Sequence, residues 1–292
     1  MRVHGLSCGC LLAIAATAVA QDPPPSAQAA YYAGDYAACA RLYAEQADRT
    51  PPVDGMGYEA AACLALAGDR DGAFARLHAL PWHQLRSGMA EEADLAALRD
   101  DPRWPVLLER ARAERARDEA GLDHALVDEL KARVARDQAA RRRMSADPRD
   151  AAGDEAARID RDNTAWLKAL LAQQGWPGYD RVGREGSQAA WLLAQHADHD
   201  RAFQERALAM LATAVGHGQA SGTHLAYLTD RVRVAQGKRQ LYGTQFQRIN
   251  GALHPRPIAD ADGVDARRMR HGLPTLAEYI AAVEAARAAP AR

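Results

Sequence analysis

The sequence predicts an all-α fold, in which a short helical-repeat array is followed by a separate C-terminal helical domain. Alanine makes up roughly a quarter of the 292 residues, and it has the lowest helical cost of any side chain. Ala33-Gly34-Asp35 recurs 34 residues later as Ala67-Gly68-Asp69, a spacing typical of stacked helical pairs. No apolar run of membrane-spanning length follows the N-terminal segment, which excludes a multi-pass membrane protein.

The charge balance excludes a dedicated nucleic-acid-binding protein. The chain has 37 basic and 38 acidic residues and a formal net charge of -1. Neutralisation of phosphates requires a clear basic excess. We therefore expect no nucleic-acid partner, and no integral membrane span once the signal peptide is removed.

The first 20 residues have the pattern of a secretory signal peptide. Arg2 precedes an apolar stretch over residues 11–19, and Ala18-Val19-Ala20 supplies the small residues of a cleavage site. This pattern predicts a periplasmic or secreted protein. A lipid attached at Cys8 and an uncleaved anchor are the alternatives.

Two cysteines remain after the predicted cleavage, Cys39 and Cys63. An exported protein meets an oxidising compartment, where an even pair of cysteines is a candidate disulfide. Two small buried thiols in alanine-rich helices are the alternative.

Residues 26–110 are expected to form the repeat array and its closing element. A period of 34 residues with a Gly-Asp turn between two helices is typical of tetratricopeptide repeats, and residues 95–108 resemble the element that ends such arrays. Stacked pairs of this kind offer a concave surface to a partner. Tyr31, Tyr32, Tyr36 and Tyr58 would make this surface suitable for a protein or peptide.

Residues 111–158 are predicted to be a charged helical connector with a loop, before a helical domain over 159–288. Leu126, Leu130 and Val134 recur at four-residue spacing and give one narrow apolar stripe. The basic run at residues 141–143 lies near several acidic residues, which indicates an ordinary solvated surface.

The chemically informative part of the domain is a long helix expected over residues 188–215. At 100° per residue, His196 and Asp200 fall on its apolar arc, with Gln204 at the margin. Buried polar groups need hydrogen-bond partners. The next predicted helix, residues 221–236, offers further polar side chains at its inward positions.

Short motifs occur in order along the region from about residue 122 to 286. They include Asp137-Gln138 with Arg141, Gly175-Trp176-Pro177, Val182-Gly183, Gln195-His196-Ala197-Asp198, Phe203-Gln204, Asp230-Arg231-Val232, Gln240, Tyr242-Gly243-Thr244-Gln245 and Arg267-Arg268. On these residues the region resembles an uncharacterised bacterial family, a domain of unknown function. The resemblance implies no activity, because none is established for the family.

The inward polar residues have three interpretations: a structural network, a catalytic or ligand-binding site, or a metal site. The catalytic candidates are His196, Asp200, Arg231 and Gln245, because imidazole, carboxylate and guanidinium groups together support acid–base chemistry. The ligand-binding candidates are His224, Asp230, Tyr242 and Gln204.

A metal site would pair His196 with His199 or Asp200, and His224 could join them. The zinc-protease pattern of two histidines four apart is absent, so the sequence assigns neither a metal nor another cofactor.

Two function classes therefore stay open. The favoured one is an exported helical-repeat protein of the cell envelope that binds a protein or ligand, and the alternative is an envelope enzyme, a hydrolase, centred on His196. In both the network and the site interpretations, we expect His196 and Arg231 to converge within hydrogen-bond reach around one cavity.

Overall fold

The computed structural model describes residues 26–146, 150–250 and 252–288, so the predicted signal peptide lies outside the described residues. Most of the described residues are helical, and the strands in this part of the chain form one short hairpin. The prediction of an all-α fold is confirmed.

The first four helices are two hairpins with equivalent turns. They are α1 (Ala27–Ala33), α2 (Tyr36–Ala47), α3 (Met56–Leu66) and α4 (Arg70–Ala79). Gly34 and Gly68 take positive φ angles of 76° and 83°, which favour glycine. The next residue is the N-cap in each case: the Asp35 carboxylate accepts from Ala38 N at 3.0 Å, and that of Asp69 from Gly72 N at 2.9 Å. In both hairpins, therefore, the glycine makes the turn and the aspartate caps the second helix. The tetratricopeptide assignment itself stays a prediction.

A disulfide joins α2 to α3 across the interface of the two hairpins. It links Cys39 to Cys63, with 5.9 Å between their Cα atoms, and both residues are buried. Small alanines surround the bond in the same core cluster.

The predicted closing element packs onto the second hairpin. Residues 95–108 form most of the 3₁₀ segment η2 (Ala93–Leu98) and the start of α5 (Arg103–Glu119), and a further 3₁₀ segment, η1 (Trp82–Gln84), precedes them. Leu95, Leu98 and Trp104 are buried in one apolar cluster with Tyr58 and Phe74. This burial covers the end of the α3–α4 pair.

Five further helices form a second core. They are α6 (His124–Ala146), α7 (Asp150–Gln174), α8 (Tyr179–Gln195), α9 (Arg201–Gly216) and α10 (Gly222–Ala235). α6 packs against both α7 and α8, and Leu130, Leu167, Leu193 and Phe203 are buried between these helices. α7 runs without interruption through residue 158, where the connector was predicted to end.

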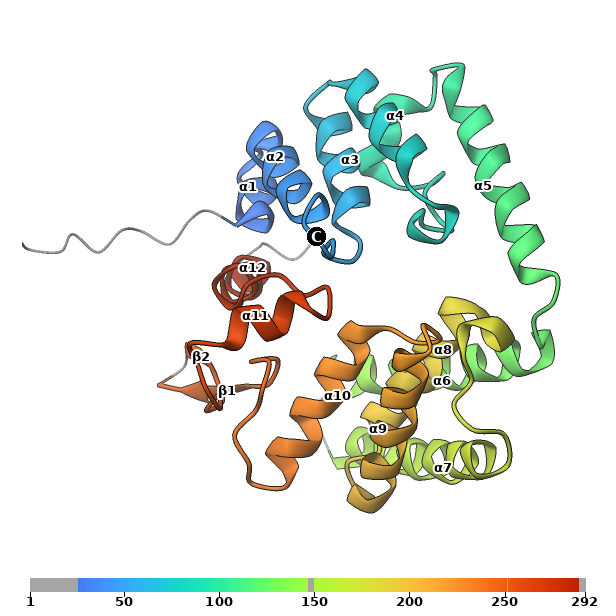
Figure 1. Cartoon of the computed structure of the whole chain (residues 1–292), viewed down its shortest axis with the longest axis vertical. Coiled ribbons are helices and arrows are strands. Elements are labelled where there is room, and N and C mark those ends of the chain that lie inside the picture. The colour runs from blue at the N-terminus through green and yellow to red at the C-terminus, as the bar shows by residue number, and fades with distance from the viewer. Residues whose placement is uncertain (1–25, 147–149, 251, 289–292) are drawn as a thin grey trace, which may run out of the picture.

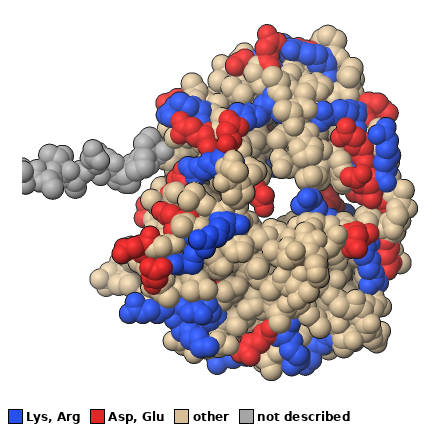
Figure 2. Space-filling view, in the orientation of Figure 1, with Lys and Arg blue, Asp and Glu red and all other residues tan. Residues whose placement is uncertain are grey.

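The last part of the described chain returns to its beginning. The hairpin of β1 (Phe246–Ile249) and β2 (Ala252–Pro255) leads to α11 (Val264–Met269) and α12 (Leu276–Ala288), and α12 packs on α1 (Figure 1). The guanidinium of Arg49 donates to both carboxylate oxygens of Glu278, at 2.9 and 2.6 Å, and Asp54 N donates to Gly272 O at 3.3 Å. The described chain therefore closes on itself, and Figure 2 shows an opening near the middle of this face with charged side chains at its rim.

None of the helices in the three described ranges combines the length and the apolar character that crossing a membrane requires.

Candidate functional site

The sequence around His196 forms a corner between two helices. α8 ends at Gln195 and α9 begins at Arg201, so the prediction of one continuous helix over residues 188–215 is wrong. The physical reason is a cap: the Asp200 side chain accepts from Phe203 N at 3.0 Å and so starts a new helix. His196 and Asp200 consequently do not share a helix face.

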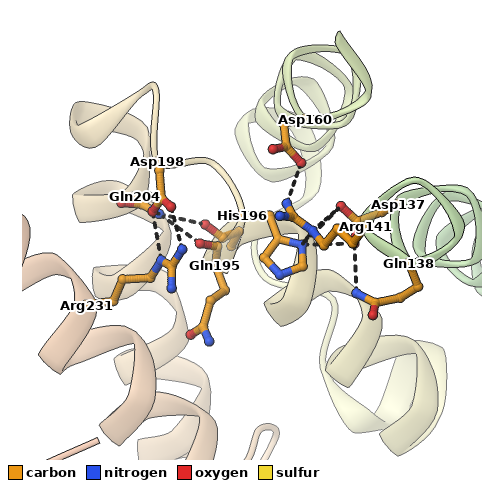
Figure 3. A network of polar contacts seen from close by, with 10 residues as sticks. Asp137, Gln138, Arg141, Asp160, Gln195, His196, Asp198, Gln204 and Arg231 are labelled. Atoms are coloured by element: carbon orange, nitrogen blue, oxygen red, sulfur yellow. Dashed lines mark hydrogen bonds and ion pairs between the residues drawn. The ribbon is translucent and has the colours of Figure 1, made fainter. Parts of the chain in front are cut away.

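His196 contacts a carboxylate from another helix. Its Nδ1 lies 2.9 Å from Oδ2 and 3.1 Å from Oδ1 of Asp137, which is on α6 (Figure 3). Asp137 is buried, whereas the side chain of His196 retains 15% of its exposure. Leu130 on the same helix is buried about two turns earlier, so Asp137 continues the buried face of α6.

Arg141 completes this cluster and determines where the protons lie. Its Nε is 3.1 Å from both Asp137 Oδ1 and His196 Nδ1, and its second terminal nitrogen donates to Asp160 Oδ1 of α7 at 2.7 Å. Arginine can only donate. The Nε–H of Arg141 and the Nδ1–H of His196 both find an acceptor when the first points to Asp137 Oδ1 and the second to Asp137 Oδ2.

This arrangement leaves the lone pair of His196 on Nε2. Within the described residues, nothing is hydrogen-bonded to that atom. An imidazole held through Nδ1 by a carboxylate, with Nε2 unoccupied, has the form of a general base.

The two carboxyl groups of the cluster differ in acidity. Burial alone would raise the pKa of Asp137, but the hydrogen bond from His196 and the charge of Arg141 hold this pKa below its usual value. Burial raises the pKa of Asp160, and the nearby Asp137 carboxylate adds to the increase. Asp137 is therefore the carboxylate that stays ionised and orients the imidazole.

The same residues are the donors that a metal ion could use. One ligand atom each from Asp137, Asp160 and His196 lies within 4.8 Å of the others. The predicted metal partners of His196 are not among them: His199 is exposed and Asp200 caps α9. The guanidinium of Arg141 already bridges the two carboxylates, so a cation would have to displace it.

A second polar group lies on the other side of the corner (Figure 3). Arg231 of α10 forms a bidentate ion pair with Asp198, with Nε donating to Oδ1 at 2.7 Å. The amide of buried Gln204 donates to Asp198 Oδ1 at 3.1 Å and to the backbone oxygens of Ala194 and Gln195 at 3.3 and 3.1 Å. Gln204 thereby satisfies carbonyl groups that the end of α8 leaves without helical partners.

The expected convergence of His196, Asp200, Arg231 and Gln245 does not occur. Arg231 pairs with Asp198 because the corner turns residue 198 toward α10, and Asp200 faces α7, where it accepts from Lys168 Nζ at 2.7 Å. Gln245 lies in the loop after α10, and its side-chain Nε2 donates a hydrogen bond to Thr244 Oγ1 at 3.2 Å. The four candidate side chains therefore have different partners: Asp137 for His196, Lys168 for Asp200, Asp198 for Arg231 and Thr244 for Gln245.

Asp230 and Tyr242 belong to the scaffold of the loop after α10. The fully buried Asp230 carboxylate accepts from the backbone N–H groups of Leu241, Tyr242 and Thr244 at 2.6 to 3.2 Å, and from the Thr244 hydroxyl at 3.0 Å. The Tyr242 hydroxyl lies 3.1 Å from His271 Nε2. Every oxygen of Asp230 is thus occupied by the protein itself, which leaves none for a ligand.

His224, the remaining ligand-binding candidate, is stacked on Trp191. The ring centroids are 4.1 Å apart with 9° between the planes. Burial lowers the pKa of His224 to about 4, so the imidazole is neutral at pH 7.

Sequence reasoning missed the central cleft. A cavity of about 810 Å³ opens between the η1 region and the N-terminal parts of α6 and α8. Trp82 and Arg86 line it from the N-terminal helices, and Tyr179 and Arg184 from α8. Its lining residues lie between positions 82 and 185 of the sequence, so no short sequence motif predicts the cleft.

The structure also brings together residues on which the family resemblance rests. Asp137, Arg141 and His196 form one cluster, and Asp198 with Arg231 forms the next. Searches found no curated protein and no solved structure that matches the chain. A family model does match, over residues 124–290, which is more than half of the sequence. The chain belongs to the family of unknown function DUF6624.

Proposed function

We propose that the chain is an exported binding protein of the bacterial cell envelope, which takes a ligand the size of a short peptide in the central cleft. The observation that carries the proposal is the cleft itself. Its volume of about 810 Å³ falls in the range of ligand-binding pockets, and both the N-terminal helices and the family region supply its walls.

Export is supported by two independent features. Residues 1–20 have the composition of a secretory signal. Cys39 and Cys63 form a buried disulfide, and such bonds persist in oxidising compartments.

The tyrosines of the N-terminal helices are a weaker candidate for the binding surface. Tyr58 is buried, its hydroxyl donates to Glu92 at 2.8 Å, and Arg86 covers its ring. The Tyr31 hydroxyl donates to Asp94 at 2.8 Å. These contacts favour the cleft as the place where a partner segment binds.

A dye placed in the cleft tests the proposal. Ser87 is exposed and lines the cleft, and Ala212 is exposed on α9 outside it. Since Cys39 and Cys63 are bonded, Ser87→Cys and Ala212→Cys would each give the exported protein one thiol for an environment-sensitive fluorophore. A pool of random pentapeptides should change the emission at position 87, saturably, and leave position 212 unaffected. Equal responses, or none at position 87, would contradict the proposal.

A second candidate function is hydrolysis, because His196 Nε2 is free for proton transfer while Nδ1 is held by Asp137. The exposed His199 three residues away supplies the control. With p-nitrophenyl acetate as substrate, His196→Ala should reduce the rate by about 100-fold at a temperature where its melting curve shows a folded protein. His199→Ala should leave the rate and the melting temperature unchanged. A lower melting temperature with unchanged hydrolysis would instead identify a structural network.

A further inference from the structure

Most cations that line the central cleft are already paired. Arg86 pairs with Glu59 and Glu92, while Arg115 and Lys131 share Glu185, with Lys131 Nζ 2.8 Å from its carboxylate. These groups stabilise the walls and have little charge left for a ligand.

Arg184 is different. It is exposed in the cleft wall, and no carboxylate of the described residues lies within ion-pair distance of its guanidinium. Its guanidinium also hydrogen-bonds the Tyr179 side chain, and its charge partly offsets the increase that burial causes in the pKa of Asp54, which lies beyond ion-pair distance. Its Cζ lies 4.4 Å from the centre of the Tyr179 ring, so one face of the guanidinium is covered by the aromatic ring. The remaining N–H groups at the edge of a stacked guanidinium have the geometry that matches a carboxylate.

The backbone fixes this presentation. Gly183 interrupts α8 between Tyr179 and Arg184 with a φ of 65° and a ψ of -178°, a conformation that favours glycine. A Cβ at this position would lie 3.0 Å from Leu122 Cδ1. The Val182-Gly183 match to the family therefore lies where the chain turns Arg184 into the cleft.

The neighbouring histidine adds no competing charge. His83 lines the same cleft, and burial, together with the proximity of Arg184, lowers its pKa. A neutral imidazole beside the guanidinium leaves a single cation at this point of the wall.

The overall charge of the lining excludes a polyanion. Five carboxylates line the cleft against four cations, and two of the carboxylates, Glu119 and Asp128, have no ion pair with any described residue. A nucleic acid would be repelled, whereas a ligand with one carboxylate would find Arg184, the lining cation that has no ion pair with a described residue.

We infer that the cleft binds short peptides by their free terminal carboxylate, with the Arg184 guanidinium as its bidentate partner. The inference rests on the proposed binding function and names the chemistry that the ligand must carry. The aromatic rings of Trp82 and Tyr179 would contact the preceding residues of the peptide.

Affinity selection from two random pentapeptide pools tests it, one with free carboxyl ends and one with carboxamide ends. The full exported protein should enrich the free-acid pool, and Arg184→Gln should reduce this enrichment at least about tenfold, because the variant loses a charge-assisted hydrogen-bonded pair with the carboxylate. Arg112→Gln, an exposed arginine of α5 outside the cleft, is the matched control and should retain it. Melting temperatures show that each variant is folded.

The outcomes separate the inference from the function on which it rests. If both pools are enriched equally and Arg184→Gln has no effect, the cleft binds peptides but not through the carboxylate. If neither pool is enriched, the carboxylate inference fails together with the proposed peptide-binding function.

Discussion

Asp137 and His196 are 59 positions apart in the sequence, and yet His196 Nδ1 lies 2.9 Å from Asp137 Oδ2. The contact joins the middle of α6 to the end of α8, next to the ion pair of Arg141 with Asp160. Asp137 is almost fully buried, so the same hydrogen bond both satisfies a buried carboxylate and orients the His196 imidazole.

Asp137→Asn should lower the free energy of unfolding by about 2 to 3 kcal/mol, the cost of disrupting buried hydrogen bonds to charged groups. Urea unfolding at pH 7 measures this. Asp162→Asn is the control, because Asp162 pairs with Arg133 but is 71% exposed, and its loss should stay below about 1 kcal/mol. Equal losses in the two variants would show that burial of the pair has no energetic effect.

Asp230→Asn should be more destabilising, by about 3 kcal/mol or more, because an amide replaces one acceptor oxygen with a donor that faces backbone N–H groups. Asp262→Asn, at an exposed position of the following segment, should be neutral. Differential scanning calorimetry compares the two. An unchanged transition in Asp230→Asn would rule out the role of Asp230 in holding the loop.

His224 predicts a pH dependence of stability. Its pKa in the folded state is about 4, below the ordinary histidine value of 6.5, so the unfolded chain binds more protons between these two pH values. Stability is therefore complete above pH 6.5 and falls toward pH 4, by up to about 3 kcal/mol.

His224→Phe keeps the stack on Trp191 and removes the titration, so its unfolding free energy should vary less between pH 7 and pH 4.5. His199→Phe, at an exposed site, should follow the parent protein. Parallel pH profiles for all three proteins would contradict the assignment to His224.

The Cys39–Cys63 bond should stabilise the exported protein by about 3 kcal/mol, the value expected when a loop of this length is closed in the unfolded chain. The Cys39→Ala/Cys63→Ala variant measures the loss. Peptide mapping of the non-reduced protein should recover the two cysteines in one linked fragment. Two free thiols would refute the bond.

The sequence was informative wherever a local rule dominates. Gly34-Asp35 and Gly68-Asp69 predict their turns because glycine permits the positive φ and aspartate caps the next helix. The spacing of the apolar residues of α6 likewise predicts its buried stripe. Asp137 and Arg141 occupy the next inward positions of that stripe. Two charged residues on a buried face predict a partner in the core, and this pattern could have indicated the cluster around His196.

The errors came from competition between local signals. The apolar period favoured one helix through residues 196–200, but the capping chemistry of Asp200 prevailed and turned the chain. The β1–β2 hairpin was missed although Asn250-Gly251 is a typical hairpin dipeptide. The central cleft depends on how distant helices meet, which periodicity does not encode.

The contact of α12 with α1 has a consequence for what the family name denotes. The family model begins at residue 124. The last helix of the matched region, α12, nevertheless packs on α1, which ends at Ala33 and so lies well before the start of the match. The residues that the family model matches are therefore not the whole of the unit that packs together. A fragment cut at the family boundary would strip α12 of its neighbour, and the resulting apolar flank would be a source of aggregation.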